Sequence, residues 1–315
     1  MAPDMDVVVS YCIVNTEQRA LLLRCLDAVA RERAALPFAT EVLVVDNASS
    51  DGSAGAARGH PTVDELIRLR QRRGKGANDS ALLERARGRY CLLLNEDAEL
   101  LPGATAALVA ALEARQDAAA AGAELLGAGG ARQASAWRFP SPSTALLIAL
   151  GLHKPFVVQS RGSRARTVDW SQSAALLVRR EAAERIGWFD PAFFVYSDEV
   201  DFCKRLHDAG WTVLFAPEAQ AVHHERHGGS PVPERRIVEL SRNRDRYMRK
   251  HHGPAAAFAV RCLTAWTYAV RSVLAVAAPG HDPRRYRRHV TATLFPRRGE
   301  GLAEAAAEFN RGPRL

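Results

Sequence analysis

The chain has 315 residues, of which 47% are hydrophobic and 25% are charged, and its formal net charge is +8. This composition excludes an intrinsically disordered chain, and the length is sufficient to bury a substantial core. The charge is uneven, because residues 1–225 hold 25 Lys/Arg against 28 Asp/Glu whereas residues 226–315 hold 18 against 7. The basic end either attracts an anionic surface, lipid or nucleic acid, or consists of solvated helix faces.

The first part of the chain predicts strands that alternate with helices. Four apolar runs predict buried strands, at residues 7–14, 41–45, 66–69 and 90–94. Helices are predicted between and after them, at residues 21–29, 74–87 and 102–115. Such alternation indicates an α/β fold with a mostly parallel sheet and helices on both faces. Ligands of these sheets bind beyond the carboxyl ends of the strands.

The second part is less regular. Residues 119–165 are rich in Ala, Gly, Ser and Pro and predict loops and short elements. Further strands are predicted at residues 168–178 and 211–215, and helices at residues 181–186, 198–209, 234–251 and 255–278. A linker at residues 228–233 separates the last two helices from the rest. We therefore predict an α/β domain at residues 1–227 and a basic, partly apolar helical extension at residues 228–315.

The cysteines and the N-terminus indicate a cytoplasmic protein. The five cysteines show neither zinc-site spacing nor a disulfide framework, and they are Cys12, Cys25, Cys91, Cys203 and Cys262. We expect buried, reduced thiols. The acidic start lacks the basic and then apolar pattern of a secretion signal.

Carboxylates follow two predicted strands and begin one predicted helix. Asp46 follows the second strand, where it could bind a ribose or base, or simply cap its loop. Asp97, in the segment Asn95-Glu96-Asp97, could bind a divalent cation beside a diphosphate, or belong to a helix-capping acidic loop. Asp198, Glu199 and Asp201 begin a helix, where they could include a general base or only complement the helix dipole.

Two other motifs are less specific. His223-His224 follows a strand and could add a metal ligand, although such pairs are more often ordinary surface or core residues. Gly74-Lys75-Gly76 lacks both the P-loop and the dinucleotide-binding patterns, so its glycines indicate a tight entry into a helix.

The order of these motifs resembles glycosyltransferase family two, a family of inverting enzymes with the GT-A fold. The similar segments are VVDNASSDGS at 44–53, GKGANDSAL at 74–82, LLLNEDAELLPGA at 92–104 and the block at 168–224. The resemblance covers residues 6–252, and it is nearest to the rhamnosyltransferase-type members of bacterial cell-wall and polysaccharide assembly. It implies a GT-A domain at residues 1–227.

The resemblance also implies roles for individual residues. Nucleotide-binding residues would be Asp46, Asn47, Asn15, Gly74 and Asn95. Asp97 would bind Mg²⁺ or Mn²⁺, with His224 completing the metal site. Glu199 would be the general base, with Asp198 as its competitor because the family's Glu-Asp order is reversed here. Acceptor-binding residues would be Trp170, Gln172 and Asp201. Two further departures are Asn15-Thr16-Glu17 in place of Asn-Tyr-Asn, and Gln172-Ser173 in place of Ser-Gly.

The function implied is sugar transfer from a nucleoside-diphosphate donor, with dTDP-rhamnose as a candidate, to a saccharide or lipid-linked acceptor. The alternative is a non-catalytic nucleotide-sugar-binding protein on the same fold. Nucleic acid is not an expected partner, because residues 1–225 are net negative and carry no recognition motif.

The helix at residues 255–278 raises a separate question about membranes. Arg261 and Arg271 argue against a spanning helix, whereas Trp266, Tyr268 and the flanking basic residues favour a lipid–water interface. We expect a peripheral helix at the inner face of the plasma membrane, or else a helix packed on the catalytic core.

Overall fold

The computed structural model describes residues 6–224, 233–277 and 281–312. Its strands are β1 (Val9–Asn15), β2 (Thr40–Asp46), β3 (Glu65–Arg68), β4 (Tyr90–Asn95), β5 (Ala98–Leu100), β6 (Ala118–Leu126), β7 (Ala136–Trp137), β8 (Arg166–Val168), β9 (Trp170–Ser171), β10 (Ala175–Arg179) and β11 (Thr212–His223). Its helices are α1 (Arg19–Ala35), α2 (Ser53–Gly59), α3 (Lys75–Arg85), α4 (Ala104–Glu113), α5 (Pro142–Ala149), α6 (His153–Phe156), α7 (Arg180–Arg185), α8 (Asp198–Asp208), α9 (Pro233–Leu274), α10 (Pro283–Leu294) and α11 (Leu302–Arg311).

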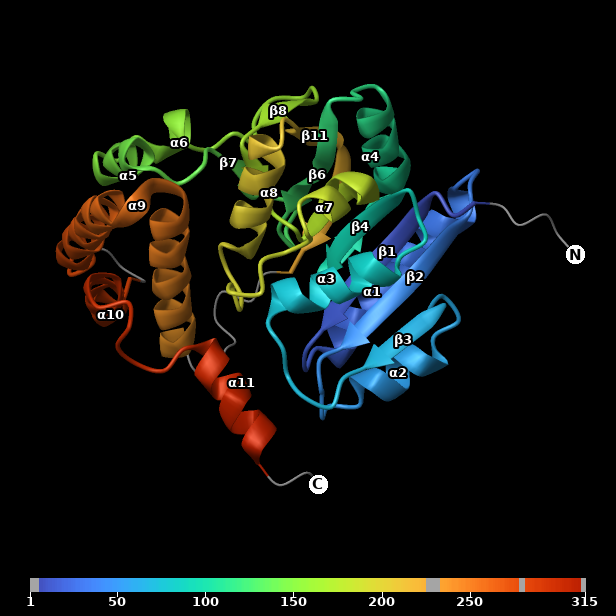
Figure 1. Ribbon diagram of the computed structural model, residues 1–315, viewed down its shortest axis with the longest axis horizontal. Helices are drawn as coiled ribbons and strands as arrows, with labels where there is room; N and C mark the ends of the chain where they lie inside the picture. Colours follow the sequence, from blue (N-terminus) through green and yellow to red (C-terminus); the bar gives the residue numbers. More distant parts are fainter. Residues whose placement is uncertain (1–5, 225–232, 278–280, 313–315) are drawn as a thin grey trace, which may run out of the picture.

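One large sheet organises the molecule, in the order β3-β2-β1-β4-β10-β6-β11-β5, with β8 also paired to β11. Strands β3, β2, β1 and β4 lie side by side and parallel (Figure 1). Strand β10 is antiparallel to both of its neighbours, and β11 is parallel to β6 but antiparallel to β5 and β8. The predicted α/β fold is confirmed, and its sheet is parallel in the N-terminal half and mixed in the other half.

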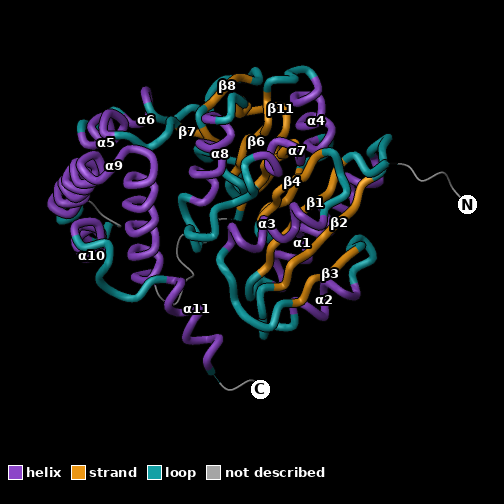
Figure 2. The backbone as a smooth tube through the Cα atoms, in the orientation of Figure 1, coloured by secondary structure: helices purple, strands orange, loops and turns teal. Residues whose placement is uncertain are grey.

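Apolar side chains bury a core on each face of this sheet. Tyr11 and Ile13 of β1 belong to the core that includes α1 and α4, whereas Cys12 belongs to the opposite core, which includes α3, α7 and α8. These three residues are at most 1% exposed. Continuous apolar runs are typical of parallel strands buried on both faces. The result is a helix–sheet–helix arrangement, in which helices flank the strands on both sides (Figure 2).

Strand β6 lies where the sequence predicts only loops and short elements. It consists of AAAAGAELL, and all but its last residue are buried. Alanine and glycine are depleted in strands, but here their small size allows close packing. A Cβ at Gly122 would lie 1.9 Å from Ser171 Oγ. Tertiary packing therefore outweighs local propensity at this strand.

The predicted strand at residues 168–178 is also wrong in detail. This segment forms the end of β8, then β9 and β10, and β9 pairs with β7 in a small second sheet. The break falls at Asp169, whose carboxylate accepts hydrogen bonds from the backbone N–H of Phe139 and from Gln159. These contacts hold the chain against the insertion that follows β6.

The strand predicted at residues 211–215 continues to His223 as β11. Pro217 has no N–H to donate to a neighbouring strand. The pairing with β6 shifts in register between Ala216 and Gln220, which accommodates the proline. The longer strand brings its end, and the two histidines there, beside β5.

The C-terminal extension is helical, as expected. Helix α9 contains both predicted helices, with a non-helical break at Gly253 (φ 84°) before Pro254. Residues on both sides of the break form a core cluster with α5 and with the segment around α8, and the cluster is Ala145, Phe193, Val200, Tyr247, Met248, Ala257 and Val260. Helix α10 packs along α9, and α11 leads back toward the sheet (Figure 1). The predicted boundary at residues 227/228 lies outside the described residues.

The second half of α9 has a packed side and an exposed side. It therefore agrees neither with a helix wholly packed on the catalytic core nor with one wholly free to lie on a membrane. Ala257 and Val260 are packed in the core cluster, whereas Trp266 and Val273 are 63% and 73% exposed. Within residues 6–224, 233–277 and 281–312, no helix has a stretch long and apolar enough to cross a bilayer.

Candidate active site

Polar side chains end three adjacent strands at one edge of the sheet. Asn15 ends β1 directly beside Asp46 at the end of β2, and Asn95 ends β4 on the other side. Asn15 Nδ2 donates to Asp46 Oδ1 at 3.3 Å, and Asp46 Oδ2 accepts from the Ser49 N–H at 3.1 Å. Asp46 is fully buried, so it does cap its loop. Asn15 Oδ1 is buried without a hydrogen bond to any described residue, so this edge retains an acceptor for a ligand.

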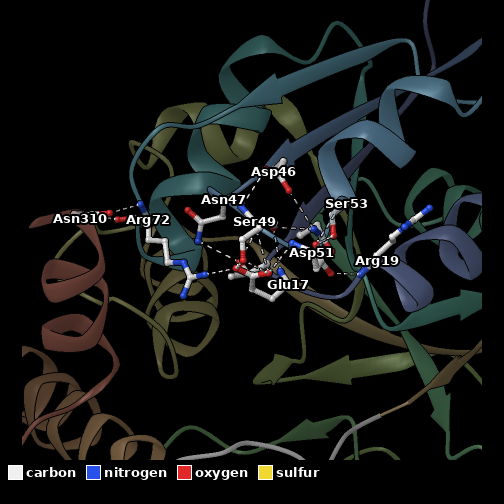
Figure 3. A network of polar contacts seen from close by, with 12 residues as sticks. Glu17, Arg19, Asp46, Asn47, Ser49, Asp51, Ser53, Arg72 and Asn310 are labelled. Carbon is white, nitrogen blue, oxygen red and sulfur yellow. Dashed lines mark hydrogen bonds and ion pairs between the residues drawn. The ribbon is translucent and has the colours of Figure 1, made fainter. Parts of the chain in front are cut away.

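A polar network joins this edge to the C-terminal helix (Figure 3). Glu17, in a left-handed conformation (φ 55°), accepts from the backbone N–H of Asp51 at 3.2 Å and pairs with Arg72. The Arg72 guanidinium lies over the Phe309 ring, 3.8 Å from its centroid. Asn310 accepts from the Arg72 N–H at 2.7 Å and donates to its C=O at 3.0 Å. Helix α11 thus holds a loop at the candidate nucleotide edge.

The start of α3 connects that edge to the candidate catalytic segment. Asn47 accepts from the Arg73 N–H at 2.8 Å and donates to its C=O at 3.1 Å. Gly74 follows, and a Cβ there would lie only 2.6 Å from the Phe194 carbonyl oxygen. The Lys75 N–H donates to the same oxygen at 2.7 Å. The glycine therefore gives the tight helix entry that the sequence predicts, since it allows backbone contact with the segment leading into α8.

The candidate metal ligand Asp97 faces His223, not the predicted His224. Asp97 Oδ1 lies 3.3 Å from His223 Nε2. The opposite ring nitrogen, Nδ1, lies 3.3 Å from Gln133 Oε1, a partner that would orient a metal-binding imidazole. His224 instead contacts the Glu99 carboxylate. Neighbouring residues of a strand point to opposite sides, so only one histidine of the pair can face Asp97. The geometry therefore places His223, and not the predicted His224, beside the Asp97 carboxylate.

Lys75 lies among carboxylates and is a residue that sequence analysis missed. Its Nζ donates to Asp79 Oδ2 at 2.6 Å. Burial alone would lower the pKa of Lys75, but the charges of Asp79 and Asp198 outweigh burial and raise it. Burial, and then the charge of Asp97, raise the pKa of Glu96 to about 7, against the effect of Lys75. The i, i+4 spacing of Lys75 and Asp79 on a predicted helix is the sequence signal for this pair.

The two candidate bases begin α8 in different environments. Asp198 is 1% exposed, and burial, followed by the charge of Glu199, raises its pKa well above the usual range. Glu199 is partly exposed and lines a cavity. The preceding Tyr196 (φ 66°) and Ser197 (φ 60°) are both left-handed. This conformation costs about 1–2 kcal/mol per non-glycine residue and is concentrated at functional sites. Of the two carboxylates, Glu199 is the one placed to contact a substrate.

The cavity beside Glu199 has a volume of about 360 Å³ and lies between α5, both halves of α9 and the segment before α8. Trp170, predicted to contact the acceptor, forms part of its wall. The ring of Trp170 stacks on Trp137 with centroids 4.5 Å apart, and its Nε1 donates to the Arg138 C=O at 3.1 Å. The wall thus contains a fixed aromatic surface of the kind that binds sugars and apolar groups.

The other two predicted acceptor residues lie elsewhere. Gln172 is not among the described residues that line the cavity. Asp201 is fully buried, and its carboxylate pairs with Arg205 at 2.8 Å, Lys250 at 2.7 Å and His251 at 2.8 Å. These ion pairs join α8 to α9, so the geometry supports a structural role for Asp201 in place of acceptor binding.

The sequence matches a known family over the half of the chain that contains the strand-end residues. Residues 10–172 match the family described as Glycosyl transferase family 2. The chain belongs to this glycosyltransferase family. The matched region includes Asn15, Asp46 and Asp97 and ends before Asp198 and Glu199. It confirms the resemblance inferred from the motifs, and the chain is therefore a glycosyltransferase.

A relative with a named substrate supports the same subgroup. The chain is 28% identical over 282 residues to N-acetylglucosaminyl-diphospho-decaprenol L-rhamnosyltransferase of Mycobacterium tuberculosis, an alignment that covers 80% of this chain and 90% of the relative. The expected similarity to rhamnosyltransferase-type members is therefore confirmed.

Solved structures share the fold at low sequence identity. The mannosyltransferase PcManGT from Pyrobaculum calidifontis, in complex with GDP-Man and Mn²⁺, has a TM-score of 0.57 and 19% identity, covering 98% of this chain and 90% of that chain. GalNAc-T7, with UDP, GalNAc and Mn²⁺, has a TM-score of 0.56 and 14% identity, and this chain spans 59% of its length. At these identities the likeness shows the fold, which is the predicted GT-A fold.

Proposed function

We propose that this glycosyltransferase transfers rhamnose, with inversion, from dTDP-rhamnose to a lipid-linked saccharide in cell-wall or polysaccharide assembly. One observation carries the proposal: Glu199 lines the acceptor-sized cavity, while Asp97 and the strand-end residues occupy the adjacent sheet edge. The packing of Gly74 against Phe194 joins these two places. The name of the M. tuberculosis relative supports the sugar and the acceptor class.

In the proposed reaction, Glu199 takes the proton of an acceptor hydroxyl. The acceptor oxygen then forms a bond to the anomeric carbon while the bond to the diphosphate oxygen breaks on the opposite face. The proton ends on Glu199 and the negative charge on the nucleoside diphosphate. General base catalysis of this kind contributes roughly 10²–10⁴-fold. Asp198 is 1% exposed and is not among the described residues that line the cavity, so Glu199 is the proposed base.

The strand-end residues are proposed to bind the nucleotide. Asp46 shapes the edge together with Asn15, whose Oδ1 has no described partner. Asn95, Asn47 and Gly74 complete this edge along β4 and the entry into α3. These five positions surround the place where ligands of parallel sheets bind.

The residues at Asp97 fit a divalent cation, Mg²⁺ or Mn²⁺. Asp97 Oδ1 is buried without a hydrogen bond to a described residue, and His223 Nε2 lies 3.3 Å away. Carboxylate oxygen and imidazole nitrogen both bind such ions. Among the described residues, no group of three or more His, Cys, Asp or Glu side chains is placed to hold a metal ion, so the remaining positions would belong to diphosphate oxygens and water. A bound cation would neutralise the departing diphosphate. The Mn²⁺ in two structures of this fold supports this assignment.

The helical extension is proposed to bind the inner face of the plasma membrane. Trp266 and Val273 expose apolar surface on α9. Four exposed arginines on α10 could contact anionic headgroups, and they are Arg284, Arg285, Arg287 and Arg288.

Vesicle flotation tests the proposed membrane binding. The full chain should float with anionic vesicles and not with neutral ones, and the double variant Trp266→Glu/Val273→Glu should not float. Equal flotation of the double variant would refute the assignment. This variant is cleaner than truncation before Pro254, which would also remove core residues.

Transfer assays test the activity itself. The full chain is incubated with a lipid-linked N-acetylglucosaminyl diphosphate, a divalent cation and dTDP-, UDP- or GDP-sugars. We expect transfer from dTDP-rhamnose, inversion at the anomeric carbon and loss of activity in EDTA. Donor binding without transfer or donor hydrolysis would instead support the alternative of a non-catalytic nucleotide-sugar-binding protein.

A further inference from the structure

The wall of the cavity beside Glu199 carries an excess of positive charge. Its described lining includes Arg138, Arg244 and Arg271, against Glu199 as the one acid. Arg138 Nε donates to the Phe156 C=O at 2.9 Å. Neither Arg244 nor Arg271 forms an ion pair with a carboxylate in the part of the chain that the structure describes. Two cations therefore line a largely apolar cavity without an ion-pair partner among the described carboxylates, and Glu199 is the one acid in the described wall.

The surroundings of His289 show the same excess. Its ring stacks on Tyr268, a residue of the cavity wall, with centroids 4.3 Å apart. Burial, and then the positive charges of Arg244, Arg285 and Arg271, lower the pKa of His289 to about 4. The positive charges of three guanidinium groups therefore all act on the His289 ring. Such a concentration of like charge is unfavourable for the empty protein and attracts an anion.

Apolar residues line this cavity, and other apolar residues near them in the sequence are exposed on the outside of the molecule. Ile148 of α5 lines the wall, while Leu150, directly after the end of α5, is 63% exposed. On α9, Val260 lines the wall while Trp266 and Val273, seven residues apart, are 63% and 73% exposed. This spacing places Trp266 and Val273 on one face of the helix. Helix α9 therefore contributes both charged residues to the cavity wall and apolar residues to the exterior.

We infer that Arg244 and Arg271 bind the phosphate groups of an acceptor whose apolar chain leaves over α5 and α9. The ligand class is a saccharide joined through a diphosphate to a long hydrocarbon chain. Glu199 lines the same cavity, so a sugar attached to the bound phosphates reaches the proposed base. Asp46 and Asp97 are not among the described lining residues, so the donor and acceptor phosphates bind at separate places. The inference rests on the proposed function and specifies its acceptor site.

Direct binding measurements test this site without requiring transfer. The full chain is titrated by calorimetry in EDTA with farnesyl diphosphate, farnesol and inorganic pyrophosphate. We expect farnesyl diphosphate to bind at least about tenfold more tightly than either partial probe, because charge-assisted hydrogen bonds add to apolar contact. Equal binding of pyrophosphate would indicate a site for free anions. If farnesol bound as tightly as farnesyl diphosphate, the arginines would not contribute to binding. Either result overturns the inference.

Charge-removing variants identify the residues. Arg244→Gln and Arg271→Gln should each weaken farnesyl diphosphate binding by roughly 10- to 100-fold and leave farnesol binding unchanged, which also shows that the cavity is folded. Arg297→Gln is the matched control, since Arg297 is exposed in the same extension and does not line the cavity. Wild-type affinity for farnesyl diphosphate in both variants would overturn the assignment.

The failure of this site and the failure of the proposed function give different results. If the probes and variants bind as expected but no donor supports transfer, the phosphate site at Arg244 and Arg271 is supported and the proposed transfer activity is refuted. If transfer occurs but the two arginine variants keep a wild-type KM for the lipid-linked acceptor, the activity stands and this site is refuted.

Discussion

Replacing Gly74 with alanine should impair catalysis more than nucleotide binding. A Cβ at this position would lie 2.6 Å from the Phe194 carbonyl oxygen and 2.8 Å from its Cα. The backbone φ of −66° suits alanine, so the conflict is steric. The oxygen must move by about 0.8 Å to turn 2.6 Å into the 3.4 Å of an ordinary contact. Overpacking of this kind costs about 1–3 kcal/mol.

The displaced segment continues through Tyr196 and Ser197 into Asp198 and Glu199, so the strain would shift the proposed base. A misplacement of about 1 Å can cost on the order of 100-fold in rate. We expect kcat of Gly74→Ala to fall by about that factor. The nucleotide dissociation constant should change only a few-fold, because the added methyl group would meet Phe194 and leaves the hydrogen bonds of Asp46 to Asn15 and Ser49 in place.

Three measurements on Gly74→Ala check this reasoning: urea unfolding, kcat for transfer and calorimetric nucleotide binding. Gly55→Ala in α2 is the matched control, since a Cβ there would meet nothing within 4 Å. It should be neutral or stabilise the protein by about 0.5–1 kcal/mol. A wild-type kcat for Gly74→Ala, with unchanged stability, would refute the idea that this contact positions Glu199.

Other substitutions test the remaining parts of the site. Glu199→Gln should lower kcat by roughly 10²–10⁴-fold with unchanged calorimetric donor affinity; an active Glu199→Gln and an inactive Asp198→Asn would reverse the two roles. His223→Ala should weaken Mn²⁺-dependent nucleotide binding about tenfold or more, whereas His224→Ala should not; the opposite ranking would contradict the observed geometry. Asn310→Ala removes two hydrogen bonds to the loop, worth about 1 kcal/mol each, and should weaken nucleotide binding by up to about 30-fold; an unchanged dissociation constant would separate α11 from the nucleotide site.

The arrangement of the strand ends at the proposed nucleotide edge could be predicted because its signals are local. A strand buried on both faces requires a continuous apolar run, and the runs that form β1, β2 and β4 end at Asn15, Asp46 and Asn95. The alternation with helices makes these strands parallel, which brings their ends to one edge. The structure confirms each of these steps, including the direct pairing of Asn15 with Asp46.

Strand β6 and the antiparallel β10 could not be predicted in the same way. An alanine-rich run fits a strand only where neighbours leave little space, and that space is set by Ser171, 49 positions after Gly122. The orientation of β10 depends on the path that the chain takes after β6, through the insertion and then β8 and β9. Both features depend on long-range packing, which has no local pattern in one sequence.

The choice between His223 and His224 shows that an irregularity in strand pairing can change which residue lies beside Asp97. Along a strand, the side that a residue faces alternates. The register shift between Ala216 and Gln220 resets this alternation after Pro217. Which side of the sheet a residue at the end of β11 faces therefore depends on this shift. Sequence analysis could place a histidine near Asp97 but could not determine which one.

The helical extension is less separate from the α/β domain than its composition suggests. Helix α9 lines the cavity beside Glu199, and α11 holds Arg72 at the nucleotide edge through Asn310. One segment therefore contacts both places where substrates are proposed to bind. The predicted boundary at residues 227/228 thus divides the chain by composition, whereas the cavity proposed to bind the acceptor is lined by residues from both parts.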